Sequence, residues 1–451
     1  MKSLMIAAMH SGAGKTVICC ALMAALKKRG LRIQAFKSGP DYIDPMFHNR
    51  VLGLDSRNLD LFLQGEEGVR RSFSGARGDV AVIEGAMGYY DGLGGGTRAS
   101  AWELASLLDV PVILVLRPKG SGITLAAQLR GLQSFRQESH IAGILLTDCK
   151  ARLAETLVPL LETECGIPVL GFLPPMQEAH LESRHLGLLT PSEVEDFSGR
   201  MDALADVLEK NADLDALLTL AAEKEDSPVP TGAAPVRCRI AVARDEAFCF
   251  HYADNLDALR LAGAELCFFS PLRDSTLPER INGLYLCGGY PELYAGQLAQ
   301  NRSLCEAVRT AVLSGLPTVA ECGGFLYLQQ RLEDTEGVSQ PMCAVLPGEG
   351  VRTGRLQRFG YLTLEAEEES LLYRSGEQIP AHEFHYWDSS ENGAAFTARK
   401  ADGRSWRCGY AGENLYAAFP HLNFNGVLPL AERFVEVCAD HEKKQERETN
   451  R

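Results

Sequence analysis

A glycine-rich loop between a predicted strand and a predicted helix constrains this chain more than any other feature. The apolar run Leu4–Met9 predicts a buried strand, and the residues His10 to Thr16 (HSGAGKT) follow it directly. Apolar residues at helical spacing then continue from Lys15 to Gly30. This order predicts a phosphate-binding loop, in which backbone N–H groups surround phosphate oxygens at the start of a helix.

The loop matches a relaxed form of the phosphate-loop pattern. The strict pattern G-x-x-x-x-G-K-[ST] would place glycine at position 9, where the chain has Met9. The relaxed form S-G-x-G-K-T keeps the two side chains that carry the chemistry. We expect Lys15 to reach the phosphate oxygens and the hydroxyl of Thr16 to hold Mg²⁺.

Length and composition exclude several classes of protein. The 451 residues are enough for two or three domains. The chain has 45 Lys and Arg against 59 Asp and Glu, and its net charge of −14 disfavours binding to nucleic acid or to an anionic membrane. The apolar run Val110–Leu116 is far shorter than the roughly 20 residues of a membrane span. The 13 cysteines include no C-x-x-C pair, which favours a reduced, cytoplasmic protein.

Short apolar runs alternate with helical patterns in both halves, which predicts two α/β domains with parallel sheets. Strands are expected at 4–9, 32–37, 80–86, 110–116, 141–147 and 169–173, and again at 239–243, 266–269, 283–287 and 318–320. The linker is expected within Lys224–Arg237, which holds three prolines and has no helical period. We predict a first domain at 1–226, a linker at 227–236, a second domain at 237–441 and a charged tail at 442–451. The second domain is expected to contain strand-like sequence at 354–424 and a last helix from about 427, which ends in the charged, frayed tail.

Two further segments carry carboxylates directly after predicted strands. Lys37–Pro45 (KSGPDYIDP) follows the second strand, and Glu84–Gly92 (EGAMGYYDG) follows the third. In open α/β sheets, ligands gather at the carboxyl ends of the strands. Carboxylates of these loops, together with Thr16, are therefore candidates for a magnesium shell, because Mg²⁺ prefers oxygen ligands.

A second reactive centre is predicted around Cys322. Residues 317–326 (PTVAECGGFL) predict a strand, a tight turn and a helix, with the cysteine at the turn. We expect the helix to lower the pKa of this thiol, and the small residues after it to leave room for a carbonyl group. Residues 286–292 (LCGGYPE) leave another strand with paired glycines that suit an oxyanion hole. The oxyanion candidates are Gly288, Gly289 and Gly323.

A cysteine nucleophile needs a base, and the second half of the chain offers several histidines. We select His421, which lies late in the domain after strand-like sequence. His382 and His385 compete with it, and spacing alone does not separate them. His251 is the remaining histidine of the domain, and His441 falls in the terminal helix, where it would be solvated.

Five segments resemble the cobyrinate a,c-diamide synthase family of cobalamin biosynthesis, in order along essentially the whole chain. They are S-G-A-G-K-T, K-S-G-P-D-Y-I-D-P, E-G-A-M-G-Y-Y-D-G, A-E-C-G-G-F-L-Y-L and H-E-F-H-Y. The resemblance implies a dethiobiotin-synthetase-like ATP-binding domain followed by a class I glutamine amidotransferase domain of the cobyrinate type. Asn423 departs from the family's H-x-H-F segment, and it stands where many glutamine amidotransferases carry a glutamate that orients the base.

The resemblance also implies roles for single residues. Cys322 would be the nucleophile that releases ammonia from glutamine, with His421 as its base. ATP and Mg²⁺ would convert a carboxylate of the substrate into an acyl phosphate, which ammonia then converts into an amide. The residues implied for ATP binding are Ser11, Gly12, Ala13, Gly14, Lys15, Thr16 and Lys37; those for Mg²⁺ are Thr16, Asp44 and Glu84; those for the substrate are Asp41, Tyr42 and Asp91.

Other functions stay open at this point. Hydrogenobyrinate or nickel-sirohydrochlorin would take the same chemistry at the same two acetates, and cobyric acid synthases amidate other side chains. A nucleotide-dependent switch with an inactive amidotransferase-like domain would share the phosphate loop, and a cysteine protease would leave the ATP-binding domain unexplained. The expected partners are small molecules, namely glutamine, ATP and a tetrapyrrole polycarboxylate, without nucleic acid or membrane; a homodimer is the assembly considered.

Overall fold

The computed structural model describes residues 1–180, 183–184, 187–188, 193–224 and 235–449. The chain divides into two compact units, one of Met1–Leu61 with Gly65–Val229 and one of Phe62–Gln64 with Pro230–Arg451. Residues 227–234 of the predicted linker lie outside the described residues. Within the described part of the chain, every helix is too short or too polar to cross a membrane.

The first unit is built on a sheet with the strand order β3-β2-β4-β1-β5-β6-β7. These strands pair in parallel, and the short β10 adds an antiparallel pair to β1. The strands of this unit are β1 (Lys2–Ala8), β2 (Ile33–Ser38), β3 (Arg57–Leu59), β4 (Val80–Glu84), β5 (Val112–Leu116), β6 (Ile141–Thr147), β7 (Val169–Leu173), β8 (Ser183–Arg184), β9 (Gly187–Leu188) and β10 (Ala222–Glu223).

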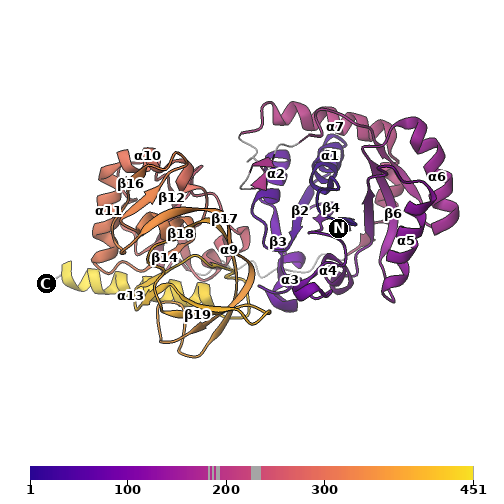
Figure 1. Cartoon of the computed structure of the whole chain (residues 1–451). Helices are drawn as coiled ribbons and strands as arrows, with labels where there is room; N and C mark the ends of the chain where they lie inside the picture. The colour runs from indigo at the N-terminus through magenta and orange to yellow at the C-terminus, as the bar shows by residue number, and fades with distance from the viewer. Residues whose placement is uncertain (181–182, 185–186, 189–192, 225–234, 450–451) are drawn as a thin grey trace. The chain divides into compact units, whose positions relative to one another are not determined.

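Helices cover both faces of this sheet, because alternate residues of its strands point to opposite sides (Figure 1). Leu4 and Ile6 of β1 join one apolar core, and Met5 and Ala7 join the other. The first core includes residues of α1 (Lys15–Lys28), α2 (Ile43–Leu52), α7 (Phe197–Asn211) and α8 (Leu214–Leu220). The second includes residues of α3 (Gly65–Ser74), α4 (Ala101–Leu108), α5 (Ile123–Phe135) and α6 (Ala151–Cys165).

The second unit contains a six-stranded sheet with the order β12-β11-β13-β14-β22-β21, in which the last pair alone is antiparallel among the pairs described. Its strands are β11 (Cys238–Ala243), β12 (Ala264–Phe269), β13 (Gly283–Leu286), β14 (Thr318–Glu321), β21 (Tyr410–Gly412) and β22 (Leu415–Ala418). The helices of the unit are α9 (Ala253–Leu261), η2 (Pro291–Leu293), α10 (Ala295–Gln300), α11 (Arg302–Leu313), α12 (Gly323–Leu328) and α13 (Leu430–Thr449).

A second, mostly antiparallel sheet of this unit has the order β16-β15-β17-β18-β23, with β19 and β20 added beside β17. Its centre is the long pair β17 (Glu349–Ala366) and β18 (Gln378–Ser389), whose register shifts twice between Arg352 and Gly360. The short β23 (His421–Leu422) pairs with β18, so that His421 lies opposite His382. The remaining strands are β15 (Arg331–Glu333), β16 (Ser339–Pro341), β19 (Phe396–Arg399) and β20 (Ser405–Cys408).

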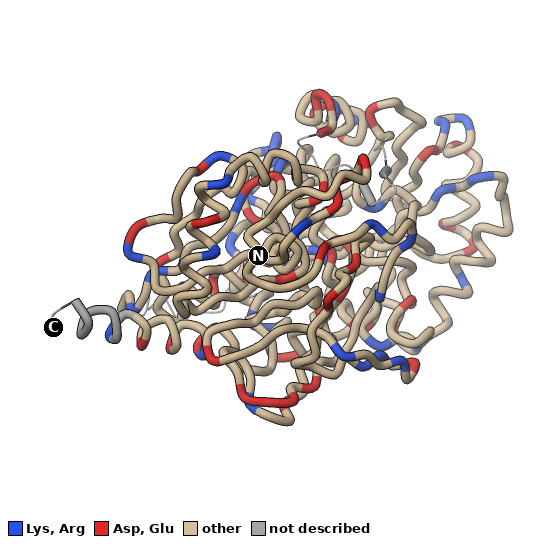
Figure 2. The backbone as a smooth tube through the Cα atoms, turned by 60° about the vertical axis from the view of Figure 1, so that its left-hand side comes forward, with Lys and Arg blue, Asp and Glu red and all other residues tan. Residues whose placement is uncertain are grey.

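The predicted α/β class is confirmed, and every strand predicted singly lies within two residues of its observed bounds. The last helix begins at Leu430 rather than near 427, and it continues to Thr449 through most of the segment predicted as a frayed tail. Positively and negatively charged residues are interspersed along the backbone of both units (Figure 2). An anionic ligand would therefore have to be held by local groups rather than by the net charge.

Candidate functional sites

The first candidate site begins with the loop between β1 and α1. Gly12 has a φ of 76° and Gly14 a φ of 90°, which is the left-handed region that favours glycine. Gly14 stands directly before α1, and a Cβ at this position would meet the side chain of Thr147 at 3.4 Å. The predicted loop therefore lies at the predicted place, between a buried strand and the N-terminus of a helix that favours anions.

Lys15 is the first residue of α1 and is buried at the loop. Its ammonium group donates to the backbone carbonyl of Met87 at 2.6 Å and lies 3.3 Å from that of His10. Burial, and then the charge of Lys37, lowers the pKa of Lys15. The charges of Lys15 and Lys37 therefore repel each other, as expected of two cations that would bind one polyanionic ligand.

Three oxygen-bearing side chains and one lysine form a buried cluster beside this loop. The hydroxyl of Thr16 lies 2.8 Å from Oε1 of Glu84 and 3.2 Å from Oδ1 of Asp44. The ammonium group of Lys37 lies 2.6 Å from Oδ2 of Asp44 and 3.0 Å from Oε1 of Glu84. Four residues predicted from three separate segments of the sequence are therefore brought together at the carboxyl ends of β2 and β4.

The charges of this cluster are strongly coupled. Burial alone would lower the pKa of Lys37, but the charges of Asp44 and Glu84 outweigh it and raise this pKa. Burial and the charge of Glu84 raise the pKa of Asp44. Burial would also raise the pKa of Glu84, but Lys37 and a hydrogen bond from His48 hold it well below its usual range. Glu84 is therefore the carboxylate whose charge the cluster stabilises most.

His48 is a member of this cluster that sequence reasoning missed. Its Nε2 lies 2.8 Å from Oε2 of Glu84, and its Nδ1 lies 3.0 Å from the hydroxyl of Ser56. A usable signal was present, because Asp44 and His48 are four residues apart and share one face of α2.

The three predicted substrate residues lie in the segments that follow β2 and β4. Oδ1 of Asp41 accepts a hydrogen bond from the N–H of Ile43 at 2.7 Å, at the start of α2, and Tyr42 directly precedes this helix. Oδ2 of Asp91 accepts from the N–H of Gly88 at 3.0 Å. The described contacts of Asp41 and Asp91 are thus with nearby backbone, and their role toward a substrate stays a prediction.

The donor set fits Mg²⁺. The hydroxyl of Thr16 lies within 3.2 Å of a carboxylate oxygen of both Asp44 and Glu84, and the ammonium group of Lys37 pairs with both carboxylates. Hard oxygen ligands of this kind are those that Mg²⁺ prefers, usually as one or two carboxylates beside phosphate oxygens.

The second candidate site is a sharp turn at Cys322, between β14 and α12. Cys322 has a φ of 47°, an uncommon value for a residue with a side chain, and its N–H donates to the carbonyl of Ala418 at 2.8 Å. The sulfur lies 3.9 Å from the carbonyl oxygen of Phe384, and the residue is 5% exposed. The predicted strand, turn and helix are present, with the thiol in a nearly enclosed position.

The geometry around Gly288 brings Cys322 and His421 together. A Cβ at position 288 would overlap Cε1 of His421 and would lie 3.4 Å from Cβ of Cys322. Both side chains are therefore within 4 Å of one point, and only a glycine fits between them. The described contacts do not bring His382 or His385, the competing histidines, to this point beside Cys322.

The other two oxyanion candidates, Gly289 and Gly323, lie close to each other. A Cβ on Gly323 would meet the backbone nitrogen of Gly289 at 3.1 Å and Cδ of Pro291 at 2.9 Å. The backbone of Gly289 therefore lies close to that of Gly323, the residue that follows Cys322. This arrangement suits two backbone N–H donors near one carbonyl oxygen.

The expectation of a lowered thiol pKa is wrong. Burial, followed by the charges of Glu292 and Glu383, raises the pKa of Cys322, and the N–H of Gly323 offsets this only in part. Burial also raises the pKa of Glu292 to about 7. Burial and the charges of two nearby acids raise this pKa more than the N-terminus of the six-residue helix α12 lowers it. The thiol therefore holds its proton at rest and depends on a base to lose it.

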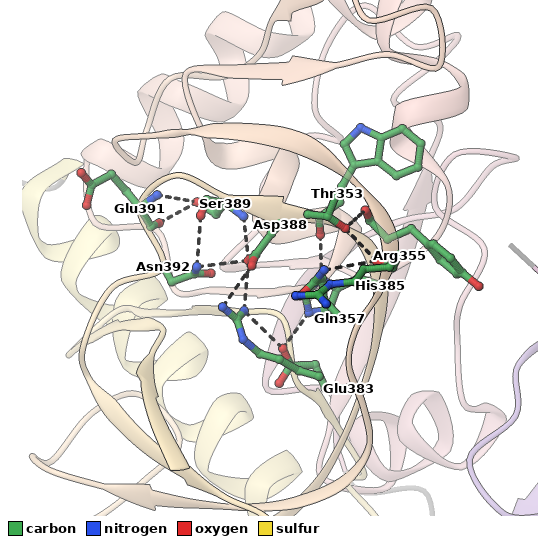
Figure 3. A network of polar contacts seen from close by, with 12 residues as sticks. Thr353, Arg355, Gln357, Glu383, His385, Asp388, Ser389, Glu391 and Asn392 are labelled. Atoms are coloured by element: carbon green, nitrogen blue, oxygen red, sulfur yellow. Dashed lines mark hydrogen bonds and ion pairs between the residues drawn. The ribbon is translucent and has the colours of Figure 1, made fainter. Parts of the chain in front are cut away.

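The competing histidines have other surroundings. Burial, and then the charges of His421 and Lys400, lowers the pKa of His382 to about 3. Nε2 of His385 lies 2.7 Å from Glu383, and its Nδ1 lies 2.6 Å from the carbonyl of Trp387, within the polar network of Figure 3. Nε2 of His251 lies 3.2 Å from the sulfur of Cys287.

Comparisons with known families agree with this division of the chain. Residues 4–188 match the family described as a CobQ/CobB/MinD/ParA nucleotide binding domain. Residues 239–427 match the family described as a CobB/CobQ-like glutamine amidotransferase domain. Each match contains one of the two candidate sites.

Curated relatives match the chain over almost its whole length. It is 38% identical over 441 residues to a cobyrinate a,c-diamide synthase of Clostridium tetani, with 97% of this chain and 100% of that protein covered. A protein of the same name from Clostridium acetobutylicum is 37% identical, with 96% and 100% covered. One from Synechococcus is 39% identical, with 97% and 98% covered.

Proposed function

Because the chain belongs to the cobyrinate a,c-diamide synthase family, we propose that it is a glutamine-dependent ligase that amidates the a- and c-acetate carboxylates of cobyrinate. The observation that carries this proposal is the juxtaposition of Cys322 and His421 across Gly288, in a chain that also holds the phosphate loop and its acidic cluster. We assign the ATP-dependent step to residues 1–226 and the release of ammonia to residues 237–441.

In the first unit, the proposed reaction activates a carboxylate. An oxygen of the substrate carboxylate attacks the γ-phosphorus of ATP, ADP leaves, and an acyl phosphate forms. Ammonia then attacks the acyl carbon, and inorganic phosphate leaves as the amide bond forms. The buried ammonium groups of Lys15 and Lys37 lie where they would offset negative charge on the phosphates.

The acidic cluster supports a metal role in the same unit. Thr16, Asp44 and Glu84 would hold Mg²⁺, which when bound neutralises charge on phosphate oxygens. His48 keeps Glu84 oriented through its 2.8 Å contact, and Ser56 orients His48 in turn. Asp41, Tyr42 and Asp91 would orient the substrate from the segments that follow β2 and β4.

In the second unit, the proposed reaction releases ammonia from glutamine. His421 takes the proton of Cys322, whose sulfur attacks the side-chain amide carbon of glutamine. The oxygen of the tetrahedral intermediate would be held by backbone N–H groups at Gly288, Gly289 and Gly323. As the C–N bond breaks, His421 returns the proton to the leaving ammonia, and water then hydrolyses the thioester to glutamate.

The remaining expectations follow from the same family membership. The 13 cysteines all lie within the described residues and are thiols rather than disulfides, which agrees with a cytoplasmic enzyme acting on small molecules. The homodimer stays a prediction.

The proposal is tested by offering the purified protein ATP, glutamine and one acceptor at a time. We expect cobyrinate to gain two amides, read as product masses, with glutamate and ADP formed in step. Hydrogenobyrinate and nickel-sirohydrochlorin serve as rival acceptors, and preferred turnover of either would contradict the choice of cobyrinate. Nucleotide hydrolysis without any amide product would favour a nucleotide switch instead.

A further inference from the structure

The position from which glutamine amidotransferases often orient their histidine is occupied by an amide in this chain. Asn423 lies two residues after His421, and its Oδ1 accepts a hydrogen bond from the N–H of Asn425 at 3.0 Å. The oxygen of Asn423 therefore closes a local turn. A general base that works through one ring nitrogen needs the other nitrogen held, because this contact fixes the tautomer.

A carboxylate from another element lies within ion-pair distance of that nitrogen, although beyond hydrogen-bond distance. Oε2 of Glu321 is 3.9 Å from Nδ1 of His421, and both side chains are 1% exposed. Glu321 is the last residue of β14, directly before Cys322 in the sequence. The parallel pair of β14 and β22 places Glu321 beside Ala418, three residues before His421. Strand pairing therefore places Glu321 near His421, although the two residues are far apart in the chain.

Two hydrogen bonds hold this carboxylate in place. The N–H of Leu422 donates to Oε1 of Glu321 at 3.1 Å, and the phenol of Tyr285 donates to Oε2 at 3.1 Å. Burial, and then the charge of Glu321, raises the pKa of Tyr285, so the phenol keeps its proton and acts as a donor. The donors come from two other elements, β13 and β23, so contacts from outside its own strand fix the carboxylate.

We propose that Glu321 is the positioning residue of His421, and that Cys322, His421 and Glu321 form a triad whose acid directly precedes the nucleophile. This inference rests on the proposed release of ammonia at Cys322. With its charge near Nδ1, Glu321 favours the tautomer of His421 that carries a proton on Nδ1, so that Nε2 accepts the proton of the thiol. The same carboxylate stabilises the imidazolium that exists while the sulfur is charged.

The test is a set of substitutions in the full-length protein, assayed for glutamate release and for amidation driven by ammonium chloride. In Glu321→Gln the amide oxygen still accepts from Leu422, but the amide N–H₂ faces His421 and favours the wrong tautomer. We expect glutaminase kcat to fall about 100-fold, with KM for glutamine within about threefold. Amidation driven by ammonium should stay within about twofold of the parent.

Two further variants separate positioning from folding. Glu321→Asp keeps the charge and should regain about tenfold of the activity lost in Glu321→Gln. Asn423→Ala should keep glutaminase activity within about threefold, because its side chain serves only the local turn.

Glutaminase activity of Glu321→Gln within threefold of the parent would overturn the inference, and so would an equal loss of ammonium-driven amidation. The proposed function itself is judged separately, by Cys322→Ala. Glutamate release that survives in Cys322→Ala would contradict the site, whereas loss in Cys322→Ala with full activity in Glu321→Gln would contradict only the role of Glu321.

Discussion

The two candidate sites are buried to a similar degree but are built on opposite principles. In the first unit, Lys37, Asp44 and Glu84 form a dense set of compensating charges, in which each group depends on its partners. In the second unit, Cys322 and His421 meet in a dry setting where burial keeps the thiol protonated. The proposed roles account for this difference, because binding of polyphosphate and a metal ion would need permanent charge, whereas attack on a neutral amide would need charge only while the reaction proceeds.

Removing the lysine from the charged site should have the largest effect. Lys37→Met leaves the buried Asp44 and Glu84 facing each other, and we expect about 3–5 kcal/mol of lost stability in the first unit. Denaturant unfolding measures this loss. Lys28→Met is the control, because Lys28 pairs with carboxylates in a solvent-exposed setting and should change stability little. An equal loss of stability in Lys37→Met and Lys28→Met would contradict the description of Lys37, Asp44 and Glu84 as compensating charges.

Adding a methyl group to the second site should have the next largest effect. Gly288→Ala places a Cβ where Cε1 of His421 lies, so we expect glutaminase kcat to fall about 100-fold or more. Ammonium-driven amidation should be retained. Gly296→Ala is the matched control, since its Cβ would meet only Nε2 of Gln340 at 3.8 Å. A Gly288→Ala enzyme with normal glutaminase activity would show that the two side chains do not meet at this point.

Acid should weaken the second unit through His382. Its pKa is about 3 in the folded protein, against about 6.5 in an unfolded chain, so below pH 6.5 the unfolded chain binds a proton that the folded one does not. The stability that His382 contributes is complete above pH 6.5 and is lost as the pH falls, by about 2 kcal/mol at pH 5. Unfolding of the parent and of His382→Asn at pH 7 and pH 5 measures this difference. An identical pH dependence in both proteins would contradict the assignment.

The smallest effect is expected at His48, whose Nε2 contacts Oε2 of Glu84. His48→Asn should lower ATP-dependent amidation about tenfold, because residues that orient metal ligands typically contribute this much. Glutamate release should not change. His180→Asn, at an exposed position, is the control. Loss of glutaminase activity in His48→Asn would show that the two chemistries are not separable.

Patterns local in the sequence predicted much of this molecule. The phosphate loop, the turn at Cys322 and the singly predicted strands were readable because each depends on spacing within one segment. The strand β3 was missed because three residues carry almost no periodic signal. Glu321 was missed for another reason: its contact with His421 exists only after β14 pairs with β22. His48 shares a face of α2 with Asp44, which the sequence shows, but its contact with Glu84 joins two separate segments. The predicted direction of the pKa shift at Cys322 was wrong because the shift depends on burial, which the spacing of residues does not reveal.

The central claim is that one chain holds two separable chemistries, and Cys322→Ala tests it most directly. Purified parent and variant are given ATP, Mg²⁺ and cobyrinate with either glutamine or ammonium chloride, and amide products are read by mass. We predict that the variant makes the diamide from ammonium at nearly the parental rate and makes none from glutamine. Loss of both activities, or survival of the glutamine-driven one, would contradict the account.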